Sequence, residues 1–141
     1  MQLRQILQGF SFIAYNADIT HTFPVGNRFI SEQRILYEIV LRAQLEAIAQ
    51  VHPGNPYSQI HDTAVWGIVE GLVNLGLLQG DIEEIIKEEK YKPFYMHKTG
   101  HWLGLDVHDV GVYQHGETAH ALEPGQVTTV EPGIYSFSQS S

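Results

Sequence analysis

The spacing of apolar residues along the chain predicts two long amphipathic helices. The first would begin at an N-capping Ser31 and end near residues 52–54, where proline and glycine interrupt the pattern. A second helix is predicted from Ser58 to about Leu75, with Gly76 as its C-terminal cap. The first helix places apolar residues at helical spacing at Ile35, Leu36, Ile39, Val40, Ala43, Leu45, Ala47 and Ile48.

Elsewhere the pattern changes to shorter elements. Ile19–Phe23 is β-branched and aromatic, which predicts a strand closed by Pro24 and Gly26. Asp81–Glu89 predicts a short acidic helix capped by its first residue, and Val127–Val130 predicts a further strand. Helices followed by strands favour an α+β fold, with the helices on one face of a sheet.

The amino-acid composition excludes several classes of protein. The 141 residues suffice for one domain. Sixteen acidic and eight basic residues give a net charge of −8, which argues against a nucleic-acid partner. The absence of cysteine excludes disulfides, thiolate zinc sites and cysteine catalysis. No apolar run is long enough for a bilayer, and glutamines interrupt any signal-like start, so we expect no membrane association and a cytoplasmic location.

The histidines are concentrated where the chain is rich in glycine. His97, His101 and His108 lie within residues 96–111, Glu131 follows, and Asp18 borders the first predicted strand. Imidazole and carboxylate groups brought from separate strands to one face form a donor set for a hard divalent metal. The residues alone therefore support a globular α+β domain with a candidate metal site.

Other uses of these residue types are less favoured. His97 and His101 have the spacing of a helical zinc pair, but no glutamate follows the first histidine and Gly100 disfavours a helix. His52 and His61 are interpreted as structural. The carboxylates of the predicted helix Asp81–Glu89 are interpreted as a solvated face.

Four segments resemble the Xaa-Pro aminopeptidase family. Tyr15–Val25 reads YNADITHTFPV and is similar to that family's ADITRTFPV segment. His101–Gly111 reads HWLGLDVHDVG and matches its histidine block almost letter for letter. Leu122–Gly125 and Thr129–Tyr135 resemble its two Glu-Pro-Gly segments. The order and spacing of the segments also agree.

The resemblance implies a pita-bread fold, a curved sheet flanked by helices, with two divalent ions that are commonly Mn²⁺. It implies removal of the N-terminal residue from peptides with proline in second position. By this resemblance Asp18 bridges the ions, His101 binds metal, and Glu131 binds metal and accepts a proton from the attacking water. His97 and His108 match histidines that hold the substrate and shuttle protons. Prolidase-like dipeptidases share the Glu-Pro-Gly segments and are the alternative enzyme class.

The sequence also departs from the family pattern. The resemblance calls for five metal ligands, and an aspartate about a dozen residues before Asp18 and a glutamate well beyond Glu131 have no match. We expect residues 1–14 to be a non-matching segment, 15–135 a partial pita-bread domain and 136–141 a short Ser-rich tail. A truncated fragment with little activity is therefore expected, the alternative being a non-catalytic partner-binding derivative. Homo-oligomer formation is left open.

These assignments make a geometric prediction. Asp18, His101 and Glu131 should converge on one concave face, with His97 and His108 beside them. His108 is an odd number of residues from His101, so it can join only if the chain bends or bulges near Gly104 or if a second strand begins there. His21 should point away from Asp18, and Lys98 should point away from the site.

Overall fold

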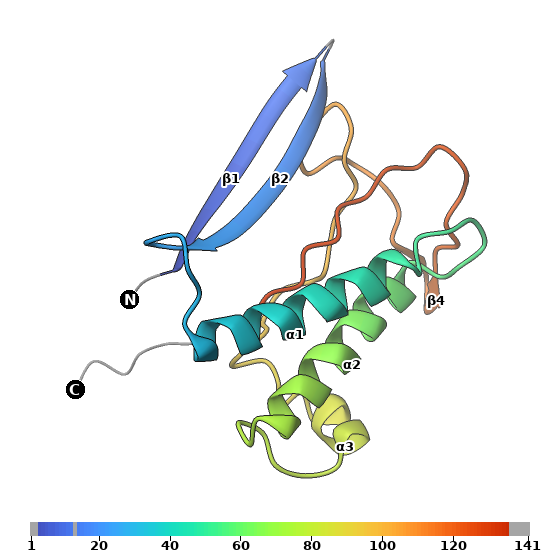
Figure 1. Ribbon diagram of the computed structural model, residues 1–141. Coiled ribbons are helices and arrows are strands. Elements are labelled where there is room, and N and C mark those ends of the chain that lie inside the picture. The colour runs from blue at the N-terminus through green and yellow to red at the C-terminus, as the bar shows by residue number, and fades with distance from the viewer. Residues whose placement is uncertain (1–2, 13, 136–141) are drawn as a thin grey trace.

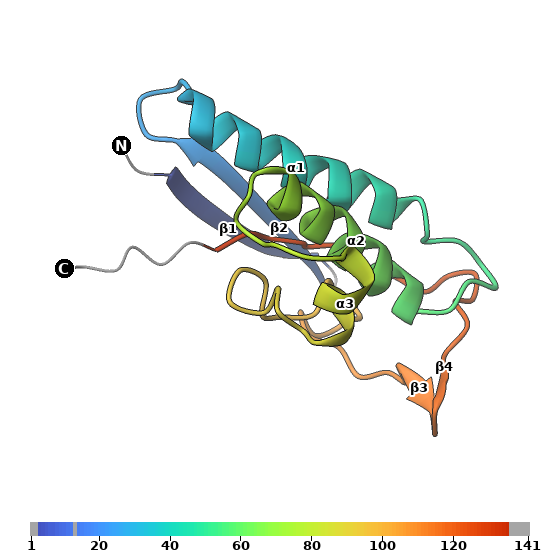
Figure 2. The ribbon, with the colours of Figure 1, turned by 90° about the horizontal axis from the view of Figure 1, so that it is seen from below.

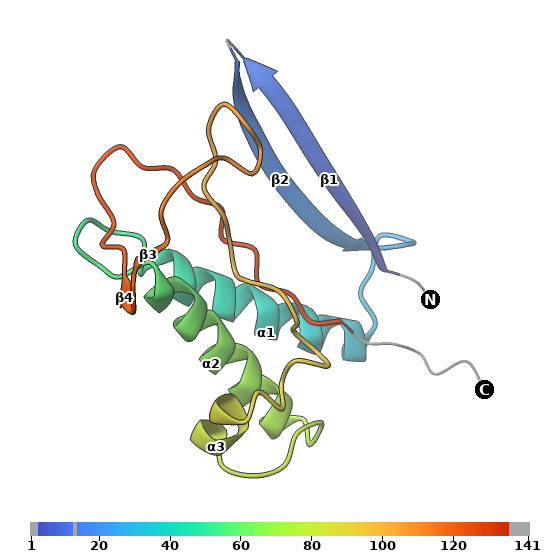
Figure 3. The same cartoon turned by 180° about the vertical axis from the view of Figure 1, so that it is seen from behind.

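The chain folds into a β-hairpin, a pair of long helices and an intervening layer of extended segments. The computed structural model describes residues 3–12 and 14–135. Its elements, in chain order, are β1 (Leu3–Phe12), β2 (Tyr15–Pro24), α1 (Ser31–Ile48), α2 (Ser58–Asn74), α3 (Ile82–Lys87), β3 (Gln114–His115) and β4 (Thr118–Ala119). The hairpin stands over α1 and α2, and the C-terminal segment passes between them (Figure 1). The view from behind shows the same order of layers (Figure 3), and in the view from below the hairpin lies behind α2 (Figure 2).

The hairpin presents one face to this intervening layer. β1 and β2 pair antiparallel along their whole length, with Gly9 opposite Asp18. Along β2 the exposed side chains of Ile19, His21 and Phe23 alternate with more buried ones. This period-two pattern confirms the predicted strand and places His21 on the face opposite Asp18. The pairing strand β1 was not predicted from the sequence.

Helix α1 confirms the first predicted helix, but it ends at Ile48 and not near residues 52–54. Its N-cap is Ile30 rather than the predicted Ser31, which is the first helical residue. The reason is that the Gln33 side chain accepts a hydrogen bond from the Ile30 amide at 3.2 Å. The Gln33 carboxamide therefore binds the orphan amide at the N-cap, and a serine cap is not required.

The two long helices approach each other closely through small residues. Ala43 and Ala47 of α1 are fully buried. A Cβ on Gly67 of α2 would lie 3.1 Å from the Ala43 Cβ, and one on Gly71 only 2.4 Å from the Ile39 Cγ2. Glycines one helical turn apart thus form the surface against which α1 packs.

The ends of the next elements follow the predicted chemistry. Gly76, with φ of 71°, ends α2, and the Leu77 amide donates to the Leu72 carbonyl at 2.9 Å, as in a Schellman motif. Asp81 caps α3 by accepting from the amides of Glu83 and Glu84. The main core lies between these helices and the segment that follows them. It comprises Ala43, Val65, Ile68, Val69, Leu72, Ile85, Tyr91 and Tyr95.

The predicted strand at Val127–Val130 is an extended segment instead. It has one isolated bridge, between Thr128 and Trp102. The Thr129 amide donates to the His101 carbonyl at 3.0 Å, but the His101 amide donates to the Thr129 hydroxyl rather than to its carbonyl. The Leu103 amide also donates to the Val127 carbonyl at 3.1 Å, so the two segments pair around Thr128 but form no regular ladder. Among the described residues, no helix combines the length and apolar content needed to cross a bilayer.

Candidate metal centre

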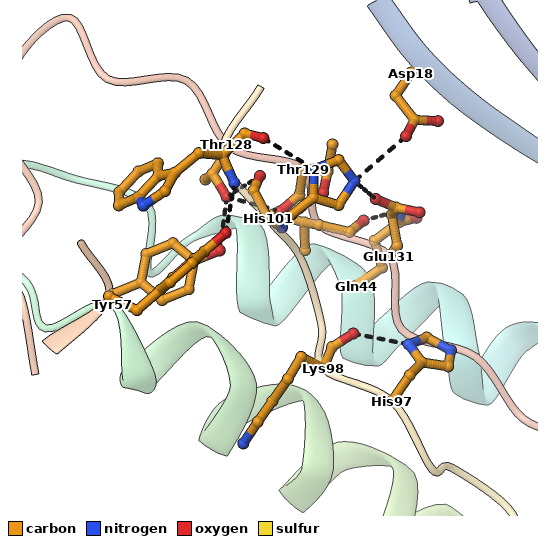
Figure 4. A network of polar contacts seen from close by, with 12 residues as sticks. Asp18, Gln44, Tyr57, His97, Lys98, His101, Thr128, Thr129 and Glu131 are labelled. Carbon is orange, nitrogen blue, oxygen red and sulfur yellow. Dashed lines mark hydrogen bonds and ion pairs between the residues drawn. The ribbon is translucent and has the colours of Figure 1, made fainter. Parts of the chain in front are cut away.

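Asp18, His101 and Glu131 converge from three separate segments, as the sequence predicted. Each offers a ligand atom, and these atoms all lie within 4.8 Å of one another. The His101 Nε2 is 3.4 Å from an Asp18 carboxylate oxygen and 3.3 Å from a Glu131 oxygen. Figure 4 shows the imidazole between the two carboxylates, with Asp18 reaching in from β2. Asp18 alone comes from a regular strand, since His101 and Glu131 lie on the extended segments.

The orientation of His101 leaves its inner nitrogen without a partner. The Nδ1 lies 2.9 Å from the Trp102 carbonyl, to which it donates. In the neutral ring Nε2 is then a lone-pair nitrogen, and it faces two carboxylates. This Nε2, the Asp18 Oδ1 and the Glu131 Oε1 are all buried without a hydrogen-bond partner. Electron-rich atoms in this arrangement suit a cation, and the donor set fits a divalent metal.

Threonine hydroxyls hold the two extended segments in register. Thr129 Oγ1 accepts from the His101 amide, and Thr128 Oγ1 donates to the His101 carbonyl, each at 3.0 Å. The Tyr57 hydroxyl, whose pKa is raised by burial, lies 3.0 Å from Thr128 Oγ1. Gln44 of α1 donates to the Val130 carbonyl at 2.9 Å. The backbone on either side of the histidine and the glutamate is thus fixed from both helices.

Gly100 is required by the closeness of these segments. A Cβ at this position would lie 2.0 Å from the Thr129 carbonyl oxygen, far inside van der Waals contact. The neighbour is backbone, so it cannot rotate away as a side chain could. Gly100 thereby allows the chain carrying His101 to approach the chain carrying Glu131.

The two predicted substrate histidines have different surroundings. The His108 ring centroid is 4.1 Å from that of His101, edge to face. It gets there because the chain turns back, with the Asp109 amide bonded to the Trp102 carbonyl at 3.0 Å. The predicted bend near Gly104 is confirmed.

His97 lies further from the three converging side chains. Its Nδ1 donates to the Lys98 carbonyl at 2.7 Å, and its Nε2 lies 2.8 Å from the Tyr135 hydroxyl. In the neutral ring the phenol is then the donor to Nε2. The amine of Lys98 points away from the centre, as predicted (Figure 4).

A groove runs from the centre along α1. It encloses about 970 Å³ and is lined by Asp18, His97 and Glu131 together with apolar side chains of α1 such as Val40 and Leu41. The groove combines the charged groups of the centre with the apolar wall of α1, which suits an amphipathic ligand.

Several residues that shape the centre had no predicted role. Tyr135, Gln44 and the threonines at 99, 128 and 129 were not assigned a role. Tyr135 and Thr129 lie within a family-like segment, which was the available signal. Gln44 gave none, because a polar residue on an amphipathic helix is ordinarily solvent-facing.

An imidazole nitrogen that faces two partly buried carboxylates, beside a groove, defines a candidate centre for a divalent metal. The chain belongs to metallopeptidase family M24, whose family model matches residues 7–140. The match begins at residue 7, inside the predicted segment 1–14, and ends at residue 140, beyond the predicted domain 15–135. The family is one of hydrolases that use a divalent metal.

Individual relatives agree with this assignment. The chain is 50% identical over 127 residues to the Xaa-Pro aminopeptidase of Haemophilus influenzae, and 46% identical over 127 residues to that of Escherichia coli. Each alignment covers 90% of this chain but only 29% of the relative. The chain therefore spans about three tenths of the length of these curated relatives.

Solved structures show the same fold. The aminopeptidase PepP of Pseudomonas aeruginosa superposes with a TM-score of 0.95 at 48% identity, over 98% of this chain and 31% of that one. A zinc-substituted E. coli aminopeptidase P in complex with product gives a TM-score of 0.89 at 45% identity, over 94% of this chain and 30% of that one. The α+β assignment and the pita-bread fold are confirmed for the part of the fold that this chain represents.

Proposed function

We propose that this chain carries part of the metal centre of an Xaa-Pro aminopeptidase. Such an enzyme hydrolyses the bond after the N-terminal residue of a peptide whose second residue is proline. The observation that supports this best is the convergence of Asp18, His101 and Glu131, with ligand atoms within 4.8 Å and no other partner for the inward-facing ones. The names of the Haemophilus and E. coli relatives support the reaction class.

Each residue of the centre has a proposed role. Asp18, His101 and Glu131 hold the ion, for which we propose Mn²⁺. A bound divalent ion supplies a Lewis acid that lowers the pKa of water and polarises a carbonyl. Glu131 accepts the proton of the attacking water and returns it to the leaving amine. Its carboxylate suits both tasks, because one oxygen can bind metal while the other exchanges a proton.

The substrate is proposed to be a peptide. His97 lies on the groove wall and His108 lies against the His101 ring, so the two imidazoles flank the centre and can orient a peptide carbonyl or amide. The E. coli aminopeptidase P, one of the structural neighbours, is described in complex with substrate. The apolar wall formed by α1 offers a surface for a proline ring and its neighbours.

The chain alone is proposed to turn over peptides poorly. The family resemblance calls for five ligands, of which Asp18, His101 and Glu131 are matched here. Two missing carboxylates would leave the charge of a second ion uncompensated, so we expect one ion to bind at most. Manganese as the ion, a cytoplasmic location and homo-oligomer formation stay predictions.

A paired peptidase assay tests the proposal. This chain and the full-length Haemophilus relative are incubated with Mn²⁺ and either an Xaa-Pro-Xaa tripeptide or an Xaa-Pro dipeptide. We expect the relative to cleave the tripeptide, and this chain to be ~100-fold slower or worse, because ligands of the centre are missing. Cleavage of the dipeptide alone would favour a prolidase. Equal rates for the chain and the relative would contradict the incomplete centre.

A partner-binding role without catalysis is the second candidate. It is favoured by large apolar side chains exposed on α1, where Leu41, Leu45 and Ile48 are 40%, 58% and 47% accessible. A derivative of this kind has no need to bind metal. Absence of Mn²⁺ binding by the purified chain would favour it over the enzymatic proposal.

A further inference from the structure

Behind the metal centre, three polar side chains meet inside the protein. The Thr99 hydroxyl lies 2.6 Å from the Tyr95 hydroxyl and 2.8 Å from the Nδ1 of His61, which projects from α2. Tyr95 is fully buried and Thr99 is 1% exposed. Polar groups so deeply buried are costly unless all their hydrogen bonds are made. The cluster is thus a specific arrangement that a purely apolar core would not need.

The direction of these hydrogen bonds follows from burial. Burial raises the pKa of Tyr95 to about 12, so its phenol carries a proton at neutral pH. Burial, together with the nearby charges of Lys98 and His97, lowers the pKa of His61 to about 4, so its ring is neutral. Thr99 is the hydrogen-bond partner of the buried phenol, which must donate to it. Thr99 then donates its single proton to His61 Nδ1, and no buried donor of the cluster is left unpaired.

This cluster lies directly beneath the residues of the centre. The backbone carbonyl of Thr99 accepts the hydrogen bond of the Glu131 amide at 2.5 Å. Thr99 also lies two residues before His101. The Tyr95 ring packs edge to face against the His97 ring, with centroids 5.1 Å apart. One hydroxyl network therefore fixes the backbone beside both a proposed metal histidine and the proposed catalytic glutamate.

We propose that His61, Tyr95 and Thr99 form a positioning triad that holds Glu131 and His101 at the separation that the metal requires. The triad anchors the His97–His101 segment to α2, and the Thr99 carbonyl passes that anchoring to Glu131. None of the three touches the proposed ion, so each acts through the backbone of its neighbours. The inference rests on the metal centre proposed above.

Two substitutions at Thr99 separate this role from packing. Thr99→Val keeps the side-chain volume but removes the hydroxyl, leaving the Tyr95 phenol without its acceptor. Thr99→Ser keeps the hydroxyl and removes a methyl group. Leu72→Val and Leu72→Ala serve as packing controls, because Leu72 is fully buried in the same core cluster as Tyr95. Its truncation lowers stability but removes no hydrogen bond of the triad.

Two measurements are made on the full chain. Mn²⁺ affinity is determined by titration calorimetry, and the hydrogen exchange of the Glu131 amide is followed in the metal-free chain. Loss of a group that orients a ligand typically weakens metal binding by ~10–100-fold, which we expect for Thr99→Val. Thr99→Ser should stay within about threefold of the unmodified chain, since its hydroxyl can make the same bonds. Glu131 amide exchange should accelerate in Thr99→Val more than in a Leu72 variant of equal stability.

The outcomes are distinguishable. Equal losses of Mn²⁺ affinity in Thr99→Val and in a Leu72 variant of matched stability would overturn the triad. If the unmodified chain binds no Mn²⁺, the proposed metal centre fails, and amide exchange alone decides the triad. In that case, faster exchange at Glu131 in Thr99→Val than in the matched control supports the triad, and equal exchange overturns it.

Discussion

At the scale of single residues, the centre depends on which nitrogen of His101 carries a proton. The Nδ1 donates to the Trp102 carbonyl, and Nε2 therefore faces Asp18 and Glu131 as a lone pair. A second, partly buried histidine, His61, is held neutral by its surroundings and accepts a hydrogen bond from Thr99. The His101 ring is oriented to bind a cation, whereas the surroundings of His61 keep its ring uncharged.

The neutral state of His61 makes stability depend on pH. Its pKa is about 4 in the folded chain, where burial dominates and the charges of Lys98 and His97 add to the effect, against an ordinary value of 6.5. Between these values the unfolded chain binds more protons. The contribution of neutral His61 to the free energy of unfolding is therefore complete above pH 6.5 and is lost as the pH falls towards 4. His61→Asn, whose Oδ1 can replace Nδ1 as acceptor but does not titrate, should lose less stability over this range.

Urea unfolding at several pH values between 7.5 and 4.5 checks this expectation. Groups that titrate in both proteins cancel when the two free energies of unfolding are subtracted at each pH. As the pH is lowered, the free energy of unfolding should fall more for the parent than for His61→Asn. Parallel curves for the two proteins would show that His61 does not resist protonation in the folded state.

The sequence was informative about which residues converge but not about how they are supported. Asp18, His101 and Glu131 were predicted together because each lies in a segment of specific family resemblance. The supporting bonds of Thr99 join positions 38 residues apart, from His61 to Thr99. Hydroxyl contacts of this kind depend on the tertiary fold and have no local sequence pattern.

At the scale of elements, the contact between α1 and α2 depends on Gly67 and Gly71. Placing alanine there sets two effects against each other. Helix propensity returns about 1 kcal/mol on replacing glycine, whereas forcing extra atoms into a packed contact costs roughly 1–3 kcal/mol. The distance between the added Cβ and its nearest neighbour decides which effect dominates at each position.

Gly71→Ala should destabilise the chain, since its Cβ would lie 2.4 Å from the Ile39 Cγ2. Gly67→Ala is the matched comparison, because its Cβ would meet the Ala43 Cβ at 3.1 Å and needs a smaller shift. We expect Gly71→Ala to lose about 1–2 kcal/mol of unfolding free energy and Gly67→Ala to be nearly neutral. Urea unfolding measures both. A Gly71→Ala variant as stable as the parent would contradict the close helix contact.

Gly100→Ala should separate the two extended segments of the centre. The new Cβ would lie 2.0 Å from the backbone carbonyl of Thr129, so the chains must move apart. We expect Tm to fall by roughly 4–8 °C and the stabilisation by added Mn²⁺ to disappear. Gly133→Ala, whose Cβ meets only ring atoms of Tyr135 at 3.1 Å, should keep the response to Mn²⁺. Thermal unfolding with and without Mn²⁺ provides the comparison.

The elements were predicted unevenly for physical reasons. α1, α2 and α3 follow from periodicity and capping, which are local properties of the chain. β1 was missed because the glutamines at positions 5 and 8 break its apolar pattern, and its strand character comes from pairing with β2. The segment Val127–Val130 was predicted as a strand, but its ladder is interrupted by the hydroxyl of Thr129.

At the scale of the whole molecule, the centre lies where the layers meet. Asp18 comes from the hairpin, and His101 and Glu131 come from the middle layer of extended segments. Gln44 of α1 and the proposed triad hold that layer in place. Metal binding would therefore tie the hairpin to the rest of the chain. The hairpin also contacts that layer through Asn16, whose backbone amide donates to the Gly104 carbonyl at 2.8 Å.

The central claim is that this chain holds a divalent ion through Asp18, His101 and Glu131, and Mn²⁺ titration calorimetry tests it most directly. The unmodified chain should bind a single ion. Glu131→Gln, which keeps the shape but removes the charge, should bind at least ~10-fold more weakly. Glu123→Gln, at an exposed position in the segment leading to the centre, should bind as the parent does. Equal Mn²⁺ affinity in the parent and in Glu131→Gln, or no binding by the parent, would contradict the claim.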